Sequence, residues 1–148
     1  MFRGILACTL MVGLALPVTA QAKDDDMRHT VEVMLGGFER PATDDEWMAL
    51  GDAAVPHLLD IAQDSGQPRS TRTRAVSALG NFGTPDVVTY LETVLEPKGD
   101  AAMQRQALRS LARAGGAKKI DLIGGFLTSE DTTLREAAVR ALGMMNAE

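Results

Sequence analysis

Cysteine is nearly absent from this chain of 148 residues, and its one copy, Cys8, lies in the first segment. Histidine is almost as sparse, with two copies, and tryptophan and tyrosine occur once each. A single thiol excludes an internal disulfide, so stability has to come from packing. His57 and Asp60 lie one helical turn apart but lack a third ligand, because His29 is on another segment. We therefore expect no metal site and no cofactor.

Catalytic motifs are also missing from the sequence. There is no Gly-x-Ser-x-Gly elbow and no recognisable Ser-His-Asp set. The glycines form neither of the patterns that cradle phosphates, and the Gly-Gly pairs are typical of helix ends or close packing. We predict that the protein is not an enzyme and has no catalytic residues.

Long hydrophobic runs are absent except near the N-terminus. Residues 4–16 form an apolar run that follows Arg3 and precedes the small residues Ala20-Gln21-Ala22. This order is typical of an export signal, and the run is shorter than the roughly 20 residues of a membrane span. We predict a cleaved signal at residues 1–22 and a periplasmic or secreted protein without stable membrane insertion. Cleavage after Ala20, a retained anchor and lipidation at Cys8 are the alternatives.

Acidic residues outnumber basic ones, 20 to 15, which makes the formal net charge −5. Such a balance argues against binding to nucleic acid. Residues 23–66 hold 11 acidic and 3 basic side chains, whereas residues 67–148 hold 9 and 11. This polarity either steers a partner or aligns copies of the chain, or it reflects ordinary solvated helix faces.

Helical periodicity dominates what remains, because apolar residues recur at spacings of three and four and no alternating strand pattern is sustained. Thr43-Asp44-Asp45-Glu46 fits a capping box, and Thr84-Pro85 fits a capped helix start. The pattern predicts eight helical segments, at about residues 27–38, 44–50, 53–63, 68–79, 84–97, 100–113, 116–128 and 131–145.

The sequence repeats itself. Arg-Thr-Arg-Ala-Val-Ser-Ala-Leu-Gly at residues 72–80 returns as Arg-Glu-Ala-Ala-Val-Arg-Ala-Leu-Gly at residues 135–143, and a weaker copy begins at Gln104. The equivalent alanines are Ala75, Ala107 and Ala138, separated by 32 (107 − 75) and 31 (138 − 107) residues. Repeats of this length predict stacked helical units that share one continuous core.

These residues resemble HEAT-like repeats, of the short form also found in bilin lyases. The resemblance implies an all-α fold, a right-handed α-solenoid of about three HEAT-like helix pairs, behind a capping helix. The domains would be the signal at 1–22, an acidic N-terminus with the capping helix at 23–42, and the repeats at 43–148. Pro68 replaces the expected aspartate of one repeat and Gln104 the expected arginine of the next, which predicts an interrupted Asp-to-Arg ladder.

Second helices of such repeats line the concave side of the superhelix, and helical spacing selects their outward residues. If the repeats stack in register, these residues form a shallow strip around one aromatic side chain. The candidate binding residues on this concave face are His57, Asp60, Asp86, Thr89, Tyr90, Thr93, Lys118, Asp121 and Leu122.

A second candidate surface is the last helix, after which the sequence contains no further second helix to cover it. We expect an open apolar flank that seeks a partner, composed of Leu134, Ala138, Val139 and Leu142. A helix packed on both neighbours is the alternative.

The sequence favours an exported, non-catalytic scaffold that binds another protein of the cell envelope or forms a homo-oligomer. The alternative is an accessory small-ligand-binding or bilin-lyase-like protein that uses the concave face. The resemblance does not separate the two, because the shared residues are packing residues.

Overall fold

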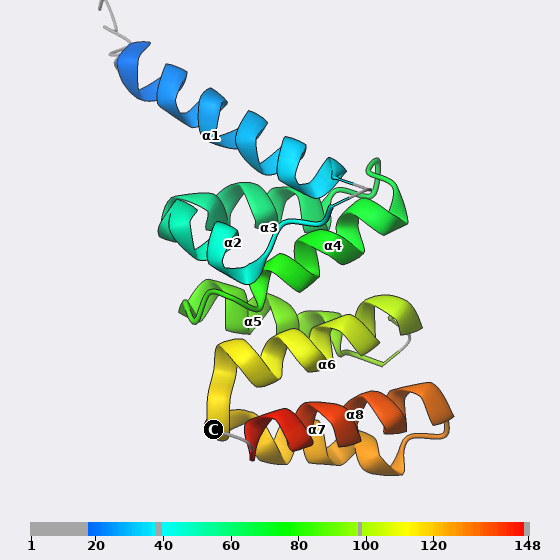
Figure 1. The fold of residues 1–148 in the computed structure, drawn as a ribbon. Helices are drawn as coiled ribbons and strands as arrows, with labels where there is room; N and C mark the ends of the chain where they lie inside the picture. The colour runs from blue at the N-terminus through cyan, green and yellow to red at the C-terminus, as the bar shows by residue number, and fades with distance from the viewer. Residues whose placement is uncertain (1–17, 38–39, 98, 147–148) are drawn as a thin grey trace, which may run out of the picture.

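The computed structural model describes residues 18–37, 40–97 and 99–146 of the chain (Figure 1). Every regular element within these ranges is helical. The elements are α1 (Val18–Gly36), α2 (Asp44–Leu50), η1 (Gly51–Ala54), α3 (Val55–Gln63), α4 (Arg69–Leu79), α5 (Pro85–Val94), α6 (Ala101–Gly115), η2 (Gly116–Lys119), α7 (Ile120–Gly125), η3 (Phe126–Thr128) and α8 (Thr132–Met145).

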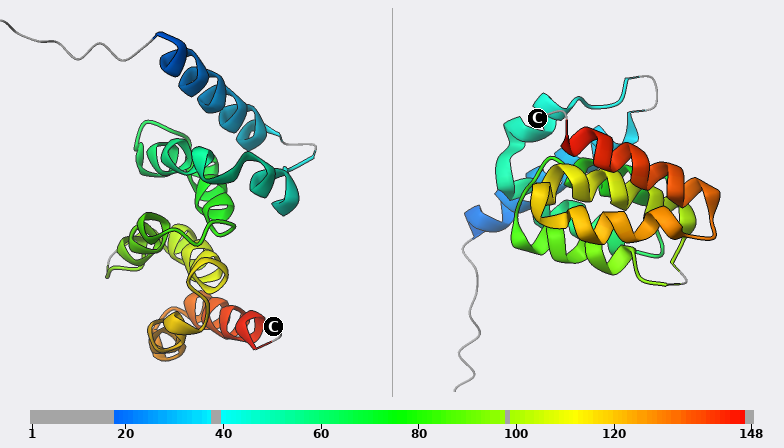
Figure 2. Two further views of the ribbon diagram at one scale, coloured as in Figure 1. Left: turned by 90° about the vertical axis from the view of Figure 1, so that its left-hand side faces the viewer. Right: turned by 90° about the horizontal axis from the view of Figure 1, so that it is seen from below.

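The helices stack as two columns, which the left view of Figure 2 shows side by side. The first helices α4, α6 and α8 pack on one another in turn, and the second helices α3, α5 and α7 form the other column. One hydrophobic core runs through all of them from Val31 to Ala141. The predicted all-α solenoid of stacked helix pairs is confirmed, while its right-handedness stays a prediction.

The first helix differs from the prediction at its start, because α1 begins at Val18 rather than near Met27. It therefore runs through the acidic segment and past Ala22, the predicted cleavage site. Its C-terminal half packs on η1, α3 and α4, where Val31 and Leu35 are buried. The helix thus covers the first end of the stack, as expected of a capping element.

Side chains cap three of the predicted helix starts. Thr43 and Glu46 form the expected capping box at α2, and Asp100 and Asp131 accept backbone N–H groups at α6 and α8. Thr84 occupies the N-cap of α5, but its hydroxyl makes no capping bond and is buried without a partner among the described residues. The predicted helix start at Thr84-Pro85 is confirmed, but the Thr84 side chain does not supply the cap.

Small residues set the distance between successive first helices. Ala75, Ala107 and Ala138 are each 0% exposed, as the repeat predicts. Gly80 is required by a close approach, since a Cβ there would lie 2.9 Å from Ser110 Cα and 2.8 Å from Arg113 Nη2. The Ser110 hydroxyl donates to the Val76 carbonyl at 2.8 Å, inside the same contact.

The substitution of Gln104 for arginine does not leave a gap. Arg72, Gln104 and Arg135 occupy the same repeat position, and each donates to a carbonyl at or just after the end of the preceding second helix. Their acceptors are Ala62 O at 3.2 Å, Glu96 O at 2.8 Å and Ser129 O at 2.7 Å, respectively. Asp100 pairs instead with Arg69 of the preceding first helix, at 2.6 Å. Gln104 therefore forms no Asp-to-Arg pair, as the sequence predicts, but its amide still reaches the carbonyl that an arginine would reach.

Arg113 connects three elements. Its guanidinium donates to Ser77 O of α4 at 2.7 Å and to Asn81 Oδ1 at 3.2 Å. It also contacts the Asp44 carboxylate of α2 at 3.1 Å. One side chain of α6 thereby links three successive helix pairs, which are α2 with α3, α4 with α5, and α6 with α7.

We expect Gly80→Ala to lower the free energy of unfolding by about 1–3 kcal/mol, because the added methyl would overpack α4 against α6. Gly143 occupies the equivalent position of α8, where a Cβ would meet nothing within 4 Å. Gly143→Ala is the matched control and, in protein dilute enough to be monomeric, should be neutral or stabilising by up to about 1 kcal/mol. Urea unfolding of both variants measures the difference, and equal losses would contradict this account of the helix contact.

We expect Asp100→Ala to lower the free energy of unfolding at neutral pH by about 1 kcal/mol through loss of the cap. The pKa of Asp100 is lowered, first by the Arg69 hydrogen bond and then by the Met103 backbone N–H. A lowered folded pKa stabilises the fold above about pH 4 and ceases to do so as the pH falls through the folded value. The difference between wild type and variant should therefore shrink below about pH 4. Denaturant unfolding between neutral and acid pH tests this, and a difference that does not depend on pH would contradict it.

Candidate functional site

The second-helix column carries the residues expected on the binding strip. The side chains on its α5, η2 and α7 segments reach the surface, and so does Asp60 at the end of α3. The exposed members are Asp60, Asp86, Thr89, Thr93, Lys118, Asp121 and Leu122.

His57 departs from this expectation, because it is only 6% exposed. Its Nε2 lies 3.3 Å from the Asp24 carboxylate of α1, and Arg28 of α1 approaches Asp60 at 3.9 Å. Helix α1 therefore lies over the outward face of α3. The placement of His57 on an open strip is wrong, since this face of the first repeat is covered by the N-terminal helix.

Tyr90 lies on α5 and is half-buried against the hydrophobic core. Burial raises the pKa of its phenol above the ordinary value, while the nearby Arg72 guanidinium acts in the opposite direction. The Thr93 hydroxyl donates to the Tyr90 carbonyl at 2.7 Å, one turn further along α5. The strip on α5 thus presents part of an aromatic ring beside hydroxyl groups.

An ion pair fixes α5 beside the η2 and α7 segment. The Lys119 ammonium of η2 bonds the Glu92 carboxylate of α5, and both side chains are partly covered. Glu92 adjoins Thr93 in the sequence, and Lys119 adjoins Lys118. This ion pair joins the two parts of the strip. We give the name α5–α7 surface to these exposed side chains of α5, η2, α7 and η3 together with half-buried Tyr90: Asp86, Thr89, Tyr90, Thr93, Lys118, Ile120, Asp121, Leu122 and Leu127.

Three large apolar side chains are exposed on the α7 and η3 segments. Ile120, Leu122 and Leu127 are 42%, 40% and 41% exposed, respectively. Only Leu122 was expected, because the prediction applied one helical period from residue 116 to residue 128. The segment instead consists of a 3₁₀ turn, a six-residue helix and another 3₁₀ turn. A 3₁₀ turn has three residues per turn, so the outward face shifts along the segment.

The last helix is less open than the sequence predicts. Leu134 and Ala138 are 7% and 0% exposed, because α6 and α7 pack against them. Leu142 is partly buried against the core, and of the four only Val139, at 59%, is exposed. An apolar flank made of all four residues is therefore wrong, and the exposed part of α8 is a narrower stripe around Val139.

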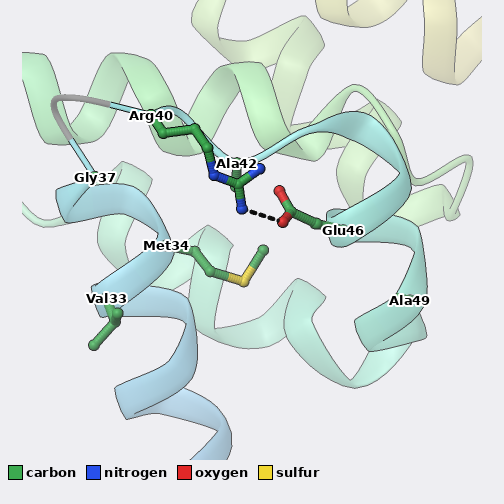
Figure 3. A pocket seen from close by; sticks show the side chains of 7 residues that line it. All are labelled: Val33, Met34, Gly37, Arg40, Ala42, Glu46 and Ala49. Carbon is green, nitrogen blue, oxygen red and sulfur yellow. Dashed lines mark hydrogen bonds and ion pairs between the residues drawn. The ribbon is translucent and has the colours of Figure 1, made fainter.

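A hollow of about 400 Å³ lies between the end of α1 and α2, away from the α5–α7 surface (Figure 3). Met34 extends across it toward α2, and Arg40 and Glu46 form an ion pair at 2.5 Å on its other side. The pKa of Glu46 is lowered, first by the Thr43 backbone N–H and then by Arg40. The lining is Val33, Met34, Gly37, Arg40, Ala42, Glu46 and Ala49.

Neither a cluster of metal ligands nor a membrane-crossing helix occurs in residues 18–37, 40–97 and 99–146. Within these ranges no three histidine, cysteine, aspartate or glutamate side chains are grouped so that they could hold a metal ion. In the same part of the chain, no helix combines the length and the hydropathy that crossing a membrane requires.

Comparison with known proteins identifies the repeat. Residues 71–97, which hold most of α4 and all of α5, match the family described as PBS lyase HEAT-like repeat. The match covers one helix pair of the stack, and the resemblance to HEAT-like repeats seen in the sequence is confirmed there. No curated protein matches the chain.

Proposed function

We propose that this HEAT-like repeat protein is an exported, non-catalytic scaffold that binds another protein of the cell envelope through the α5–α7 surface. The observation that carries the proposal is the exposure of Ile120, Leu122 and Leu127, each about two-fifths open, on one short segment. Large apolar side chains exposed beside polar residues are typical of the centres of protein contact sites.

The polar neighbours of this segment suit such a contact. Tyr90 presents an amphipathic ring, a residue type enriched at interfaces. Asp86 and Asp121 supply negative charge and Lys118 supplies positive charge. A partner of mixed charge with an apolar centre fits this arrangement.

Export rests on the first segment of the sequence. Arg3, the apolar run at residues 4–16 and Ala20-Gln21-Ala22 follow one another in the order of a signal peptide. We propose cleavage after Ala22 and a periplasmic or secreted location. N-terminal sequencing of the protein from its native host tests this, and a retained Met1 would contradict it.

A small apolar ligand is the second candidate, and the hollow between α1 and α2 favours it. Val33, Met34, Ala42 and Ala49 provide an apolar lining, and its charged pair is already matched. A bilin-like chromophore would be recognised by absorption of visible light. Protein purified from the native envelope should show no visible absorption if the scaffold proposal holds.

We expect Leu122→Asp to reduce retention of the envelope partner at least about tenfold, because a charge at the contact centre has to be desolvated. The measurement is affinity purification from native envelope extract with quantitative mass spectrometry. Met48→Asp is the matched control, since Met48 is a 54% exposed apolar residue on α2.

Equal retention by wild type, Leu122→Asp and Met48→Asp would overturn the assignment of the α5–α7 surface. Equal loss in both variants would overturn it as well, because the effect would then not be local. Circular dichroism of each variant verifies that the helical stack is intact.

A further inference from the structure

One side of α8 has the spacing of a helix-packing seam but is open. Its residues are separated by three and four positions and so share one face of the helix. All of them are exposed, and no described element packs over them. We call this set the α8 stripe: Thr132, Glu136, Val139, Arg140 and Gly143.

Two positions of the α8 stripe, those of Val139 and Gly143, are buried in the other first helices. Val139 is 59% exposed, whereas its counterparts Val76 of α4 and Leu108 of α6 are 0% exposed. Helix α6 packs on α4, and α8 packs on α6 in the same way. Val139 therefore lies where the next first helix of a stack would pack.

Gly143 supports this interpretation. Its counterpart Gly80 admits α6 so closely that a Cβ would lie 2.9 Å from Ser110 Cα. A Cβ on Gly143 would meet nothing within 4 Å. The α8 stripe thus has the small residue that a close helix contact requires, and the described residues do not supply that contact.

The charges of the α8 stripe are self-complementary, so that opposite charges can pair when two copies of the stripe meet. In an antiparallel pair of α8 helices whose two-fold axis crosses the stripe midway between Glu136 and Arg140, these two positions face each other across the axis. Glu136 then faces Arg140 of the second copy, and Arg140 faces Glu136 of that copy. Within one chain these two side chains are 61% and 68% exposed and only 3.7 Å apart at their nearest charged atoms. Both remain accessible to a second copy.

The neighbouring Arg135 side chain is hydrogen-bonded to the chain at the start of α8. The Arg135 guanidinium is held by Ser129 O at 2.7 Å, Glu130 O at 3.0 Å and Thr132 Oγ1 at 2.9 Å.

A hollow of about 250 Å³ lies beside Arg135 on α8. The Val139 side chain of a second copy is of a size to enter that hollow.

We propose that the α8 stripe binds the α8 stripe of a second copy of this chain and forms a two-fold symmetric homodimer. Such an interface uses the same patch on both subunits and closes after two copies. Because α8 belongs to the first-helix column and the α5–α7 surface to the other, the proposal does not depend on the proposed function.

Charge reversal provides the test. Glu136→Arg and Arg140→Glu should each raise the dissociation constant of the dimer by roughly 30-fold, because two weak attractive contacts become repulsive. Sedimentation velocity over a concentration series measures this, on protein expressed with its own N-terminus so that natural processing occurs. The double variant, Glu136→Arg with Arg140→Glu, should restore the wild-type dimer.

Mixing the two single variants gives a sharper outcome. The Glu136→Arg chain carries arginine at both positions, 136 and 140, and the Arg140→Glu chain carries glutamate at both. Every facing pair across the two-fold axis then has opposite charges, so a heterodimer should form although neither variant dimerises well alone. Rescue by mixing cannot come from the contact within one helix, which mixing does not repair.

A wild-type chain that remains monomeric up to its solubility limit would overturn the proposal. Failure of mixing to restore the dimer, or growth into open-ended assemblies, would overturn it too. The monomeric Glu136→Arg variant should still retain the envelope partner that depends on Leu122, so failure of the dimer and failure of the scaffold are distinguishable.

Discussion

The close approach of successive first helices is the constraint on which the rest of this fold depends. Ala75, Ala107 and Ala138 have no exposed surface, and Gly80 leaves no room for a methyl group against α6. Only small side chains at these positions bring the leucines of the seam, such as Leu79 and Leu111, into one core. The second helices then take their places in the other column, because each follows its first helix by a short turn.

The sequence predicted this part of the molecule because the residues that pack in the core recur at regular spacing. Most helix boundaries agree with the structure, including the capping box at Thr43 and the starts at Asp100 and Asp131. The alanine spacing alone indicated which helices are equivalent. The contact that Gln104 makes could not be predicted, since the sequence shows a missing arginine but not the carbonyl that the amide still reaches.

The candidate site was harder to predict because exposure depends on contacts between distant segments. His57 has the spacing of an outward residue, yet α1 crosses over it and places Asp24 beside it. Ile120 and Leu127 escaped the prediction because two 3₁₀ turns interrupt the helical period. Leu134 is buried by α6 and α7, and neither contact is visible in its own helix. The local sequence pattern therefore predicts the helices, whereas predicting which residues are exposed requires knowing how the helices pack together.

Arg113 has a consequence for how cooperatively the helix pairs of the stack unfold. Repeat arrays are commonly described by the stability of each unit and its contacts with immediate neighbours, so their ends fray one unit at a time. The Arg113 guanidinium reaches past the adjacent unit to Asp44, 69 residues away in the sequence. Opening the α2 end thus removes a contact from the third unit as well as the second. The N-terminal units are coupled beyond nearest neighbours, which favours their unfolding as one cooperative block.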